Sequence, residues 1–497
     1  MTRFSAHYIR LMFNLCSSID IPKSTAMRWL AIIAAAKVIW LIVFIALRSP
    51  SWTEHSSVGI ALQPNESLGY YHPLESLIEE GHYQGMCHLP GLLPFYLPLR
   101  MVLPEPAALQ AMIVLQVLFD IAATWALGIL AARIFHSLRA MHITYALACI
   151  STFTAVRNNY LLSDSLCISL VVLSFFSFSN YLLQSKSKHL WFTAIGLCIA
   201  VLLRPAMLVM LPGIALLLAL SNGFNRLTVR SCVILMVPTL IAISSWTLRN
   251  QLTYGRTVVL LAPLGECQPQ ITPDFAAIRD WILASGGDYQ PWAVGGEAHW
   301  FFDSPKTLPM PFEEDDFTPA CDTAMLEGLK RDFHLLHSDT ILSNEAAALE
   351  QSIIHRATQC KLSYIETHPV RYYVLNKLKF ARMILFPSRI DDLPFPAYSE
   401  MNMAQKIIKI GSWLALPLLS ALCLLATLVW IVQRKWNYLL WMCLPLGLVA
   451  VHSWIGFVEQ RYLATSYPFF IALTAGFLSR LPIMERLFSG RLLERLP

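Results

Sequence analysis

Charged side chains stand at the ends of several long apolar runs, where few charges are expected. Arginine suits a phosphate because its guanidinium fork donates two hydrogen bonds at once. Any one arginine would also serve as an anchor at the end of its run, so the prediction of an anion site rests on the whole group. The charged residues concerned are Arg157, Asp164, Arg204, Arg249, Glu459 and Arg461.

A second group of reactive side chains lies in residues 66–94. Glu66 precedes Tyr70 and Tyr71, and His88 opens a run of leucine, proline and glycine. The segment has an acidic residue, a tyrosine four residues on, a short helical stretch, a glycine, and then a Pro-Gly run that leads into the membrane. An ordinary solvated loop contains the same residue types, so these positions also have a purely structural interpretation.

The histidines of this region do not form a metal motif. His72, His82 and His88 have neither HxxxH nor HExxH spacing, although glutamates lie nearby. Polar surface histidines are the favoured interpretation. We therefore predict no metal and no other cofactor, with a divalent cation as the less favoured alternative.

Two further charges lie deep inside apolar runs. Lys37 and Asp120 are each far from the ends of their segments, where an isolated charge is costly. An ion pair between two helices is the structural interpretation. A proton relay is the functional one, and it would suit a transporter.

The composition identifies the kind of protein that must position these residues. Of 497 residues, 56% are hydrophobic and only 14% are charged, whereas soluble proteins carry roughly 25% charged residues. This apolar excess predicts an integral membrane protein and excludes a disordered chain, a collagen and a small disulfide scaffold. The net charge of +5 is no sign of nucleic-acid binding in such a protein.

Apolar runs long enough to span a bilayer recur along the chain, and a helical span needs about 20 residues. The run 190–220 is too long for one span, and Arg204-Pro205 in its middle predicts a turn. An all-α polytopic membrane protein with about ten helices, within a range of 10–12, follows. The predicted spans are 29–47, 107–132, 141–156, 165–183, two within 190–220, 229–248, 409–432, 438–454 and 462–479.

The positive charges orient the chain. With both termini in the cytoplasm, every inner loop carries at least two Lys or Arg residues, as the positive-inside rule requires. Residues 1–28 do not resemble a cleaved signal. This topology predicts an N-terminal membrane region 1–248 with a large outer loop 49–106, an exterior domain 249–405 and a C-terminal membrane region 406–497 with a cytoplasmic tail.

The exterior domain begins with a stretch rich in proline, glycine and aromatic residues at 262–319. Helical periodicity follows at 322–337, 344–367 and 369–386, so we expect a small mixed, mainly helical domain. In an oxidising compartment the exterior cysteines would form two disulfides with any of three connectivities; free or buried thiols are the alternative. These cysteines are Cys87, Cys267, Cys321 and Cys360.

Several short motifs, in order along this topology, resemble one enzyme family. It comprises the polyprenol-phosphate-sugar-dependent membrane glycosyltransferases of the GT-C fold, which include the protein O-mannosyltransferases and the aminoarabinose transferase of lipid A. The resemblance covers most of the spans, but not the middle of the exterior domain. The motifs lie at 66–94, 115–135, 161–166, 202–205, 249–255 and 459–468.

The resemblance implies a role for each candidate residue. Glu66 would be the catalytic base, and Asp164 would orient the acceptor or share that role. Glu66 stands where the family usually has aspartate, and glutamate is longer by one methylene group. Glu459 would orient an arginine. Residues that would bind the phosphate and the rest of the donor are Arg204, Arg249, Arg461, Tyr70, Tyr71 and His88.

The implied reaction is an inverting transfer of a sugar from a polyprenyl-phosphate donor to a glycolipid or protein acceptor at the outer face. The favoured setting is the bacterial inner membrane with a periplasmic site, and the endoplasmic reticulum has the same topology. A lipid or anion transporter is the first alternative, although no inverted repeat supports it. A non-catalytic envelope assembly protein is the second.

Overall fold

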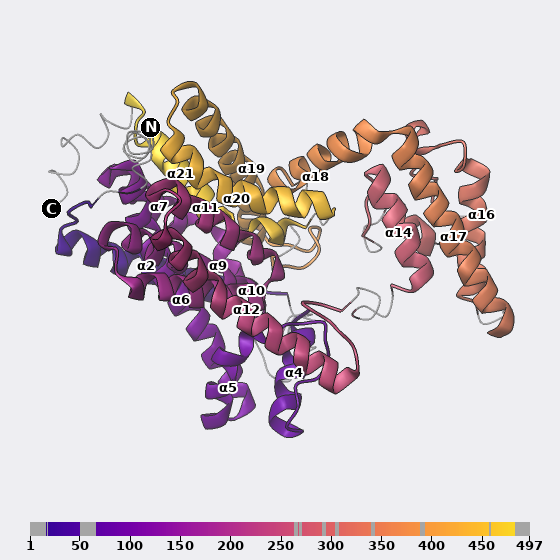
Figure 1. Cartoon of the computed structure of the whole chain (residues 1–497), viewed down its shortest axis with the longest axis horizontal. Helices are drawn as coiled ribbons and strands as arrows, with labels where there is room; N and C mark the ends of the chain where they lie inside the picture. Colours follow the sequence, from indigo (N-terminus) through magenta and orange to yellow (C-terminus); the bar gives the residue numbers. More distant parts are fainter. Residues whose placement is uncertain are drawn as a thin grey trace. The chain divides into compact units, whose positions relative to one another are not determined.

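The chain folds almost entirely into helices in the computed structural model (Figure 1). The structure describes residues 16, 18–49, 66–262, 267, 271–290, 295–303, 308–338, 343–387, 393–456 and 459–482. Within these ranges the only β-type pairing is one isolated β-bridge between Thr318 and Cys321. Two compact units divide the chain: a membrane unit (Met1–Leu261, Ile384–Val451, Glu459–Pro497) and an insert unit (Ala262–Met383, His452–Val458).

Each predicted span corresponds to an apolar helix of the structure. Within the described residues, seven helical stretches are long and apolar enough to cross a bilayer, one of them being Pro205–Asn222, and three shorter apolar helices occupy the other predicted positions. The chain is therefore a multi-pass membrane protein. The exact number of spans stays a prediction. The helices are α2 (Lys23–Leu47), α6 (Glu105–Phe135), α7 (Leu138–Ile150), α9 (Ser163–Gln184), α10 (Ser187–Leu203), α11 (Met210–Asn222), α12 (Arg226–Tyr254), α19 (Met403–Val432), α20 (Trp436–Ile455) and α21 (Tyr467–Leu478).

Helix α9 lies at the centre of the membrane unit, packed along α6 and α10 (Figure 1). In its most apolar stretch 67% of the residues are buried, against 17% in α2. The outward residues of α2, such as Ile32, Ile39 and Ile42, are apolar and exposed. An apolar exposed face is what a helix in contact with lipid requires.

The predicted turn at Arg204-Pro205 is confirmed. Helix α10 ends at Leu203, and Arg204 adopts an extended conformation with φ −146° and ψ 110°. Pro205 imposes this because its ring disfavours the helical conformation in the preceding residue. The chain restarts in a short helix, η3 (Pro205–Val209), which leads into α11.

Three short helices precede α6: α4 (Glu66–Glu79), η1 (Pro90–Leu92) and α5 (Leu93–Val102). Gly91 of η1 lies directly against the backbone at the end of α10, because a Cβ atom on Gly91 would stand 2.5 Å from the carbonyl carbon of Leu202. Only glycine permits this approach. The contact fixes η1 beside the residue that precedes the Arg204 turn.

The regular structure described in the insert unit is mainly helical. The predicted helices are present as α16 (Thr323–Leu336), α17 (Ser343–Thr367) and the continuous pair η5 (a π-helix, Arg371–Leu375) and α18 (Asn376–Leu385). The expectation of a mixed domain needs correction, since the stretch 262–319 contains α14 (Pro273–Ser285) and α15 (Glu297–Phe302) and no described strand. Helix α17 packs against α14 and α16 (Figure 1). Aromatic residues dominate their shared core, including Phe275, Trp281, Trp300, Phe301 and Phe333.

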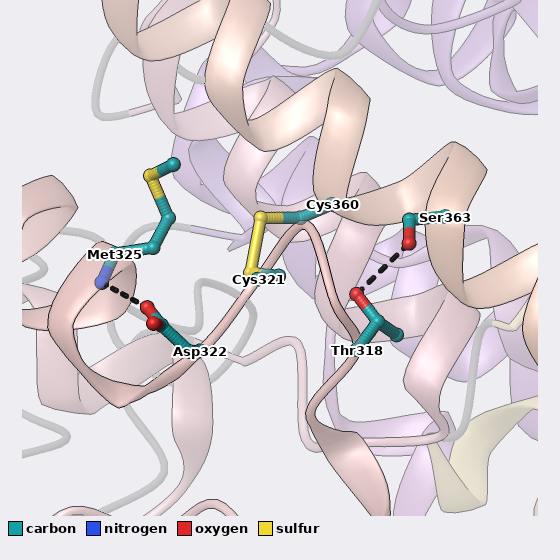
Figure 2. The surroundings of a disulfide bond; sticks show 6 residues. All are labelled: Thr318, Cys321, Asp322, Met325, Cys360 and Ser363. Carbon is teal, nitrogen blue, oxygen red and sulfur yellow. Dashed lines mark hydrogen bonds between the residues drawn. A yellow bond between two sulfur atoms is a disulfide. The ribbon is translucent and has the colours of Figure 1, made fainter.

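A disulfide between Cys321 and Cys360 joins the start of α16 to α17 (Figure 2). Close to it, the Ser363 hydroxyl donates to Thr318 Oγ1 at 3.0 Å, and Asp322 caps α16 by accepting from the Met325 N–H at 2.8 Å. Cys87 and Cys267 are disulfide-bonded as well, and the other seven cysteines are free thiols. Of the two alternatives left open for Cys87, Cys267, Cys321 and Cys360, the structure has disulfides and not free thiols.

Candidate anion-binding site

Two of the predicted site residues form a buried ion pair. Asp164 lies in the first turn of α9 and Arg204 follows the last residue of α10, so the packing of these helices brings them together. The Arg204 Nη2 and Asp164 Oδ1 atoms are 2.5 Å apart, and their side chains are 13% and 2% exposed. The first turn of a helix also favours a carboxylate, through the helix dipole.

Arg461 joins this pair from a third element, η6 (Gln460–Leu463). Its backbone carbonyl accepts a hydrogen bond from Arg204 Nη1 at 3.3 Å. Its guanidinium pairs with the carboxylate of Glu459, as expected for an orienting residue. The ring of Tyr462 lies 5.8 Å from both the Arg204 and the Arg461 guanidinium carbons.

A third arginine of this cluster is Arg157, which the sequence analysis noted but did not assign a role. It is only 2% exposed, and its charge acts on the Asp164 carboxylate together with those of Arg204 and Arg461. The sequence signal was its position at the other end of the polar turn from Asp164. Among the described side chains, the cluster brings the guanidinium groups of Arg157, Arg204 and Arg461 together with the carboxylates of Asp164 and Glu459.

Tyr70, from the 66–102 segment, lies beside the residue that precedes Asp164, and His88 of the same segment lies beside Tyr70. The Tyr70 and Ser163 hydroxyls are 3.0 Å apart, and Ser163 immediately precedes Asp164. The Tyr70 and His88 rings are in contact, with centroids 4.2 Å apart and an angle of 39° between their planes. Burial and the nearby Arg461 charge lower the pKa of His88 to about 4, so this imidazole is neutral at pH 7. A Cβ on Gly69 would lie 2.7 Å from its Nε2 atom.

Among the contacts that the structure describes, none joins the predicted site residues Glu66 and Tyr71 to the arginine cluster. Glu66 is the first residue of α4, one helical turn before Tyr70, and its side chain lies outside the described residues. Its role as a base therefore stays a prediction. Tyr71 donates a hydrogen bond of 2.5 Å to Glu105 Oε1 at the start of α6. The contacts described for Tyr71 thus connect α4 to α6 and do not involve an arginine of the cluster.

Arg249, near the end of α12, holds the loop that leads to His88. Its guanidinium donates to the backbone carbonyls of Gly85, at 3.0 Å, and Tyr83, and it lies 5.0 Å from the centroid of the Trp246 ring. Tyr83 in turn donates through its hydroxyl to the His88 carbonyl at 3.3 Å. These contacts support a role for Arg249 in shaping the loop, and the predicted direct contact with a phosphate is untested.

An apolar cavity of about 290 Å³ lies between α11 and α20, beginning at the last residue of η3. Because η3 starts immediately after Arg204, the first residue that lines the cavity, Val209, is only a few residues along the chain from the arginine cluster. The cavity is lined by Val209, Pro212, Gly213, Leu216, Leu217, Leu440, Cys443, Leu444 and Gly447.

No group of three His, Cys, Asp or Glu side chains in the described ranges is arranged to hold a metal.

Comparisons with known proteins give one structural likeness to report. No protein-family model matches the chain, and no curated protein matches it. Among solved structures, it is similar to the oligosaccharyltransferase AglB of Archaeoglobus fulgidus, in complex with an inhibitory peptide and a dolichol-phosphate, with a TM-score of 0.46 and 12% identity. The match covers 93% of this chain but 51% of that protein, so this chain spans about half its length. The functional argument therefore rests on the residues of this chain.

Proposed function

We propose that this protein is a membrane glycosyltransferase that takes a sugar from a polyprenyl-phosphate donor. The observation that supports this most directly is the arginine cluster around Asp164, at the ends of membrane helices and close along the chain to an apolar cavity. A phosphate attached to a long apolar chain matches both features. Guanidinium groups recognise the phosphate, and an apolar cavity suits an isoprenoid chain.

The reaction needs a proton acceptor and a stabilised leaving group. The acceptor hydroxyl oxygen attacks the anomeric carbon while its proton passes to a carboxylate. The bond between this carbon and the phosphate oxygen breaks, and polyprenyl phosphate leaves with the bonding electrons. This single displacement inverts the anomeric centre. Arg204 and Arg461 would stabilise the charge that develops on the phosphate.

We assign the base role to Glu66. Asp164 is already held by Arg204 at 2.5 Å, so its contacts favour a role in orienting the arginines. Glu75 accepts a hydrogen bond of 2.6 Å from the Tyr96 hydroxyl and pairs with Arg100 at 3.3 Å, which makes it a poor alternative. Glu66 begins the helix that carries Tyr70 into the cluster, and this supports its assignment.

The disulfides support the proposed orientation. All four disulfide-bonded cysteines fall in the two segments predicted to lie outside, 49–106 and 249–405. Disulfides persist in oxidising compartments and are rare in the cytosol. We therefore propose a bacterial inner-membrane protein with cytoplasmic termini and a periplasmic site. A luminal site in the endoplasmic reticulum would satisfy the same chemistry.

The test is the release of polyprenyl phosphate from a pool of polyprenyl-phosphate sugars, in membranes that also supply the acceptor. We expect release with the wild-type protein, and a loss of about 10²–10⁴ in rate for Glu66→Gln, because the amide cannot take up the proton. Glu79→Gln, which changes an acidic residue at the other end of α4, is the matched control and should retain activity.

Each outcome of this assay favours a different function. Donor binding without release in the wild type would favour a lipid or anion transporter. The absence of both binding and release would favour an assembly protein. Normal release by Glu66→Gln would move the base role to another carboxylate.

A further inference from the structure

A chain of buried polar contacts runs through the membrane unit beside the arginine cluster. It starts with the predicted ion pair, in which Lys37 Nζ lies 2.9 Å from Asp120 Oδ2 and the side chains are 1% and 9% exposed. Lys37 also reaches Thr154 Oγ1 at 3.5 Å, and the Thr124 hydroxyl donates to Asp120 Oδ1 at 3.3 Å. Both charges of the pair are therefore compensated inside the helix bundle.

Asn158 continues this chain and connects it to α9. Its Nδ2 donates to Asp120 Oδ2 at 2.8 Å, and its Oδ1 accepts from the Ser165 hydroxyl at 2.5 Å. From α6, Gln116 Nε2 donates to the backbone carbonyls of Asn158 and Tyr160 at 3.3 and 2.9 Å. The turn between α7 and α9 is thus fixed from both sides by side chains in the interior.

Asn158 and its hydrogen-bond partner Ser165 are each adjacent in sequence to a residue of the charged cluster. Asn158 directly follows Arg157 in η2 (Val156–Asn159), and Ser165 directly follows Asp164 in α9. We propose that Asp120, acting through Asn158, is a positioning residue that fixes Arg157 and Asp164 relative to each other for anion binding. This inference rests on the proposed function for its ligand, a lipid phosphate.

An ion pair with a purely structural role would behave differently. Replacing both members of a buried pair by apolar residues is often neutral for stability. Under the proposal the essential feature at position 120 is an oxygen that accepts from the Asn158 amide. Without this oxygen, Nδ2 of Asn158 loses the acceptor described for it, and the turn relaxes. Arg157 would then no longer be held in position near Asp164.

The experiment compares two double variants that both remove the charges. Lys37→Met with Asp120→Asn keeps an acceptor oxygen at position 120, and Lys37→Met with Asp120→Leu removes it. The measurements are the affinity of the purified full-length protein for a synthetic polyprenyl phosphate and the hydrogen exchange of backbone amides in residues 156–165. The control is Thr124→Val, which removes the hydrogen bond from Thr124 to Asp120 but leaves the hydrogen bond between Asp120 and Asn158 in place.

We expect the acceptor-keeping variant and the control to stay within about threefold of the wild-type affinity. The acceptor-free variant should bind at least about tenfold more weakly, the order of a lost buried hydrogen bond, and should exchange faster in residues 156–165. Equal affinity and equal exchange in the two double variants would overturn the proposal. If the acceptor-free variant does not fold, Ser165→Ala takes its place, with faster exchange expected and unchanged exchange contradicting the idea.

The two readouts separate this inference from the proposed function. A wild-type protein that does not bind polyprenyl phosphate would contradict the function. The hydrogen exchange of the backbone amides in residues 156–165 would still decide whether Asp120 positions the turn, because this measurement requires no ligand.

Discussion

The membrane unit and the insert unit differ in how far their lysine–carboxylate and arginine–carboxylate ion pairs are buried. In the membrane unit, ion pairs such as Lys37–Asp120 and Asp164–Arg204 are buried among helices whose exposed faces are apolar. In the insert unit the core is aromatic and is closed by a disulfide. Ion pairs such as Lys361–Asp280, at 3.0 Å, lie at its surface with side chains 32% and 50% exposed.

This difference tells us where a charged residue is informative. A surface pair contributes roughly 0–1 kcal/mol and is replaced with little effect. A buried charge whose partner is removed costs about 3–5 kcal/mol, so such a charge persists only where the fold or the function needs it. The buried charges of the membrane unit are therefore the residues on which the functional argument depends.

The largest expected effect comes from breaking one buried pair. Lys37→Met leaves the Asp120 carboxylate unpaired, and we expect it to lower the free energy of unfolding by about 3–5 kcal/mol. Lys361→Met at the surface of the insert unit should cost at most about 1 kcal/mol. Unfolding by denaturant titration in detergent measures both, and similar losses for the two variants would remove the distinction between the units.

The disulfide provides the next test, on the insert unit. Cys321 and Cys360 are separated by 39 residues, and removing a disulfide costs about 2–4 kcal/mol, mainly because the unfolded chain gains freedom. We expect Cys321→Ser with Cys360→Ser to increase proteolysis of the insert unit. Binding of polyprenyl phosphate should stay close to normal, since the arginine cluster lies in the membrane unit. A parallel loss of lipid binding would contradict the separation of roles.

A smaller effect is expected from pH. Because the pKa of His88 is about 4 in the folded protein and about 6.5 in an unfolded chain, the unfolded state takes up the proton first as the pH falls. Stability should therefore decrease below about pH 6.5, by about 2 kcal/mol at pH 5. His88→Gln should reduce this decrease, and His82→Gln, at an exposed histidine, should not. An unchanged pH dependence in His88→Gln would show that His88 is not buried as described.

The sequence predicted those features that depend on strong local signals. Apolar runs located the membrane helices, and the proline after Arg204 located the turn. The cost of an isolated charge was enough to suggest the Lys37–Asp120 pair. The insert helix α14 was missed because the stretch 262–319 is rich in proline and glycine, although proline is compatible with the first turn of a helix, where Pro273 lies.

The composition of the arginine cluster was only partly predictable. Arg157 and Arg249 had similar signals, yet Arg157 acts on Asp164, whereas Arg249 binds the loop carbonyls of Tyr83 and Gly85. The difference depends on how the loop before His88 packs against α12. That packing joins segments far apart in the sequence, and no local pattern encodes it.

The most direct test of the account measures how the purified protein binds polyprenyl phosphate when Arg461 is replaced. Arg461→Ala should weaken binding about 10–100-fold, because it removes a charged hydrogen-bonding group. Arg461→Lys should fall between the alanine variant and the wild type, since it keeps the charge and loses the fork. Arg230→Ala, at an exposed arginine of α12, should bind normally. An Arg461→Ala variant that binds polyprenyl phosphate as tightly as the wild type would contradict the assignment of this cluster to a lipid phosphate.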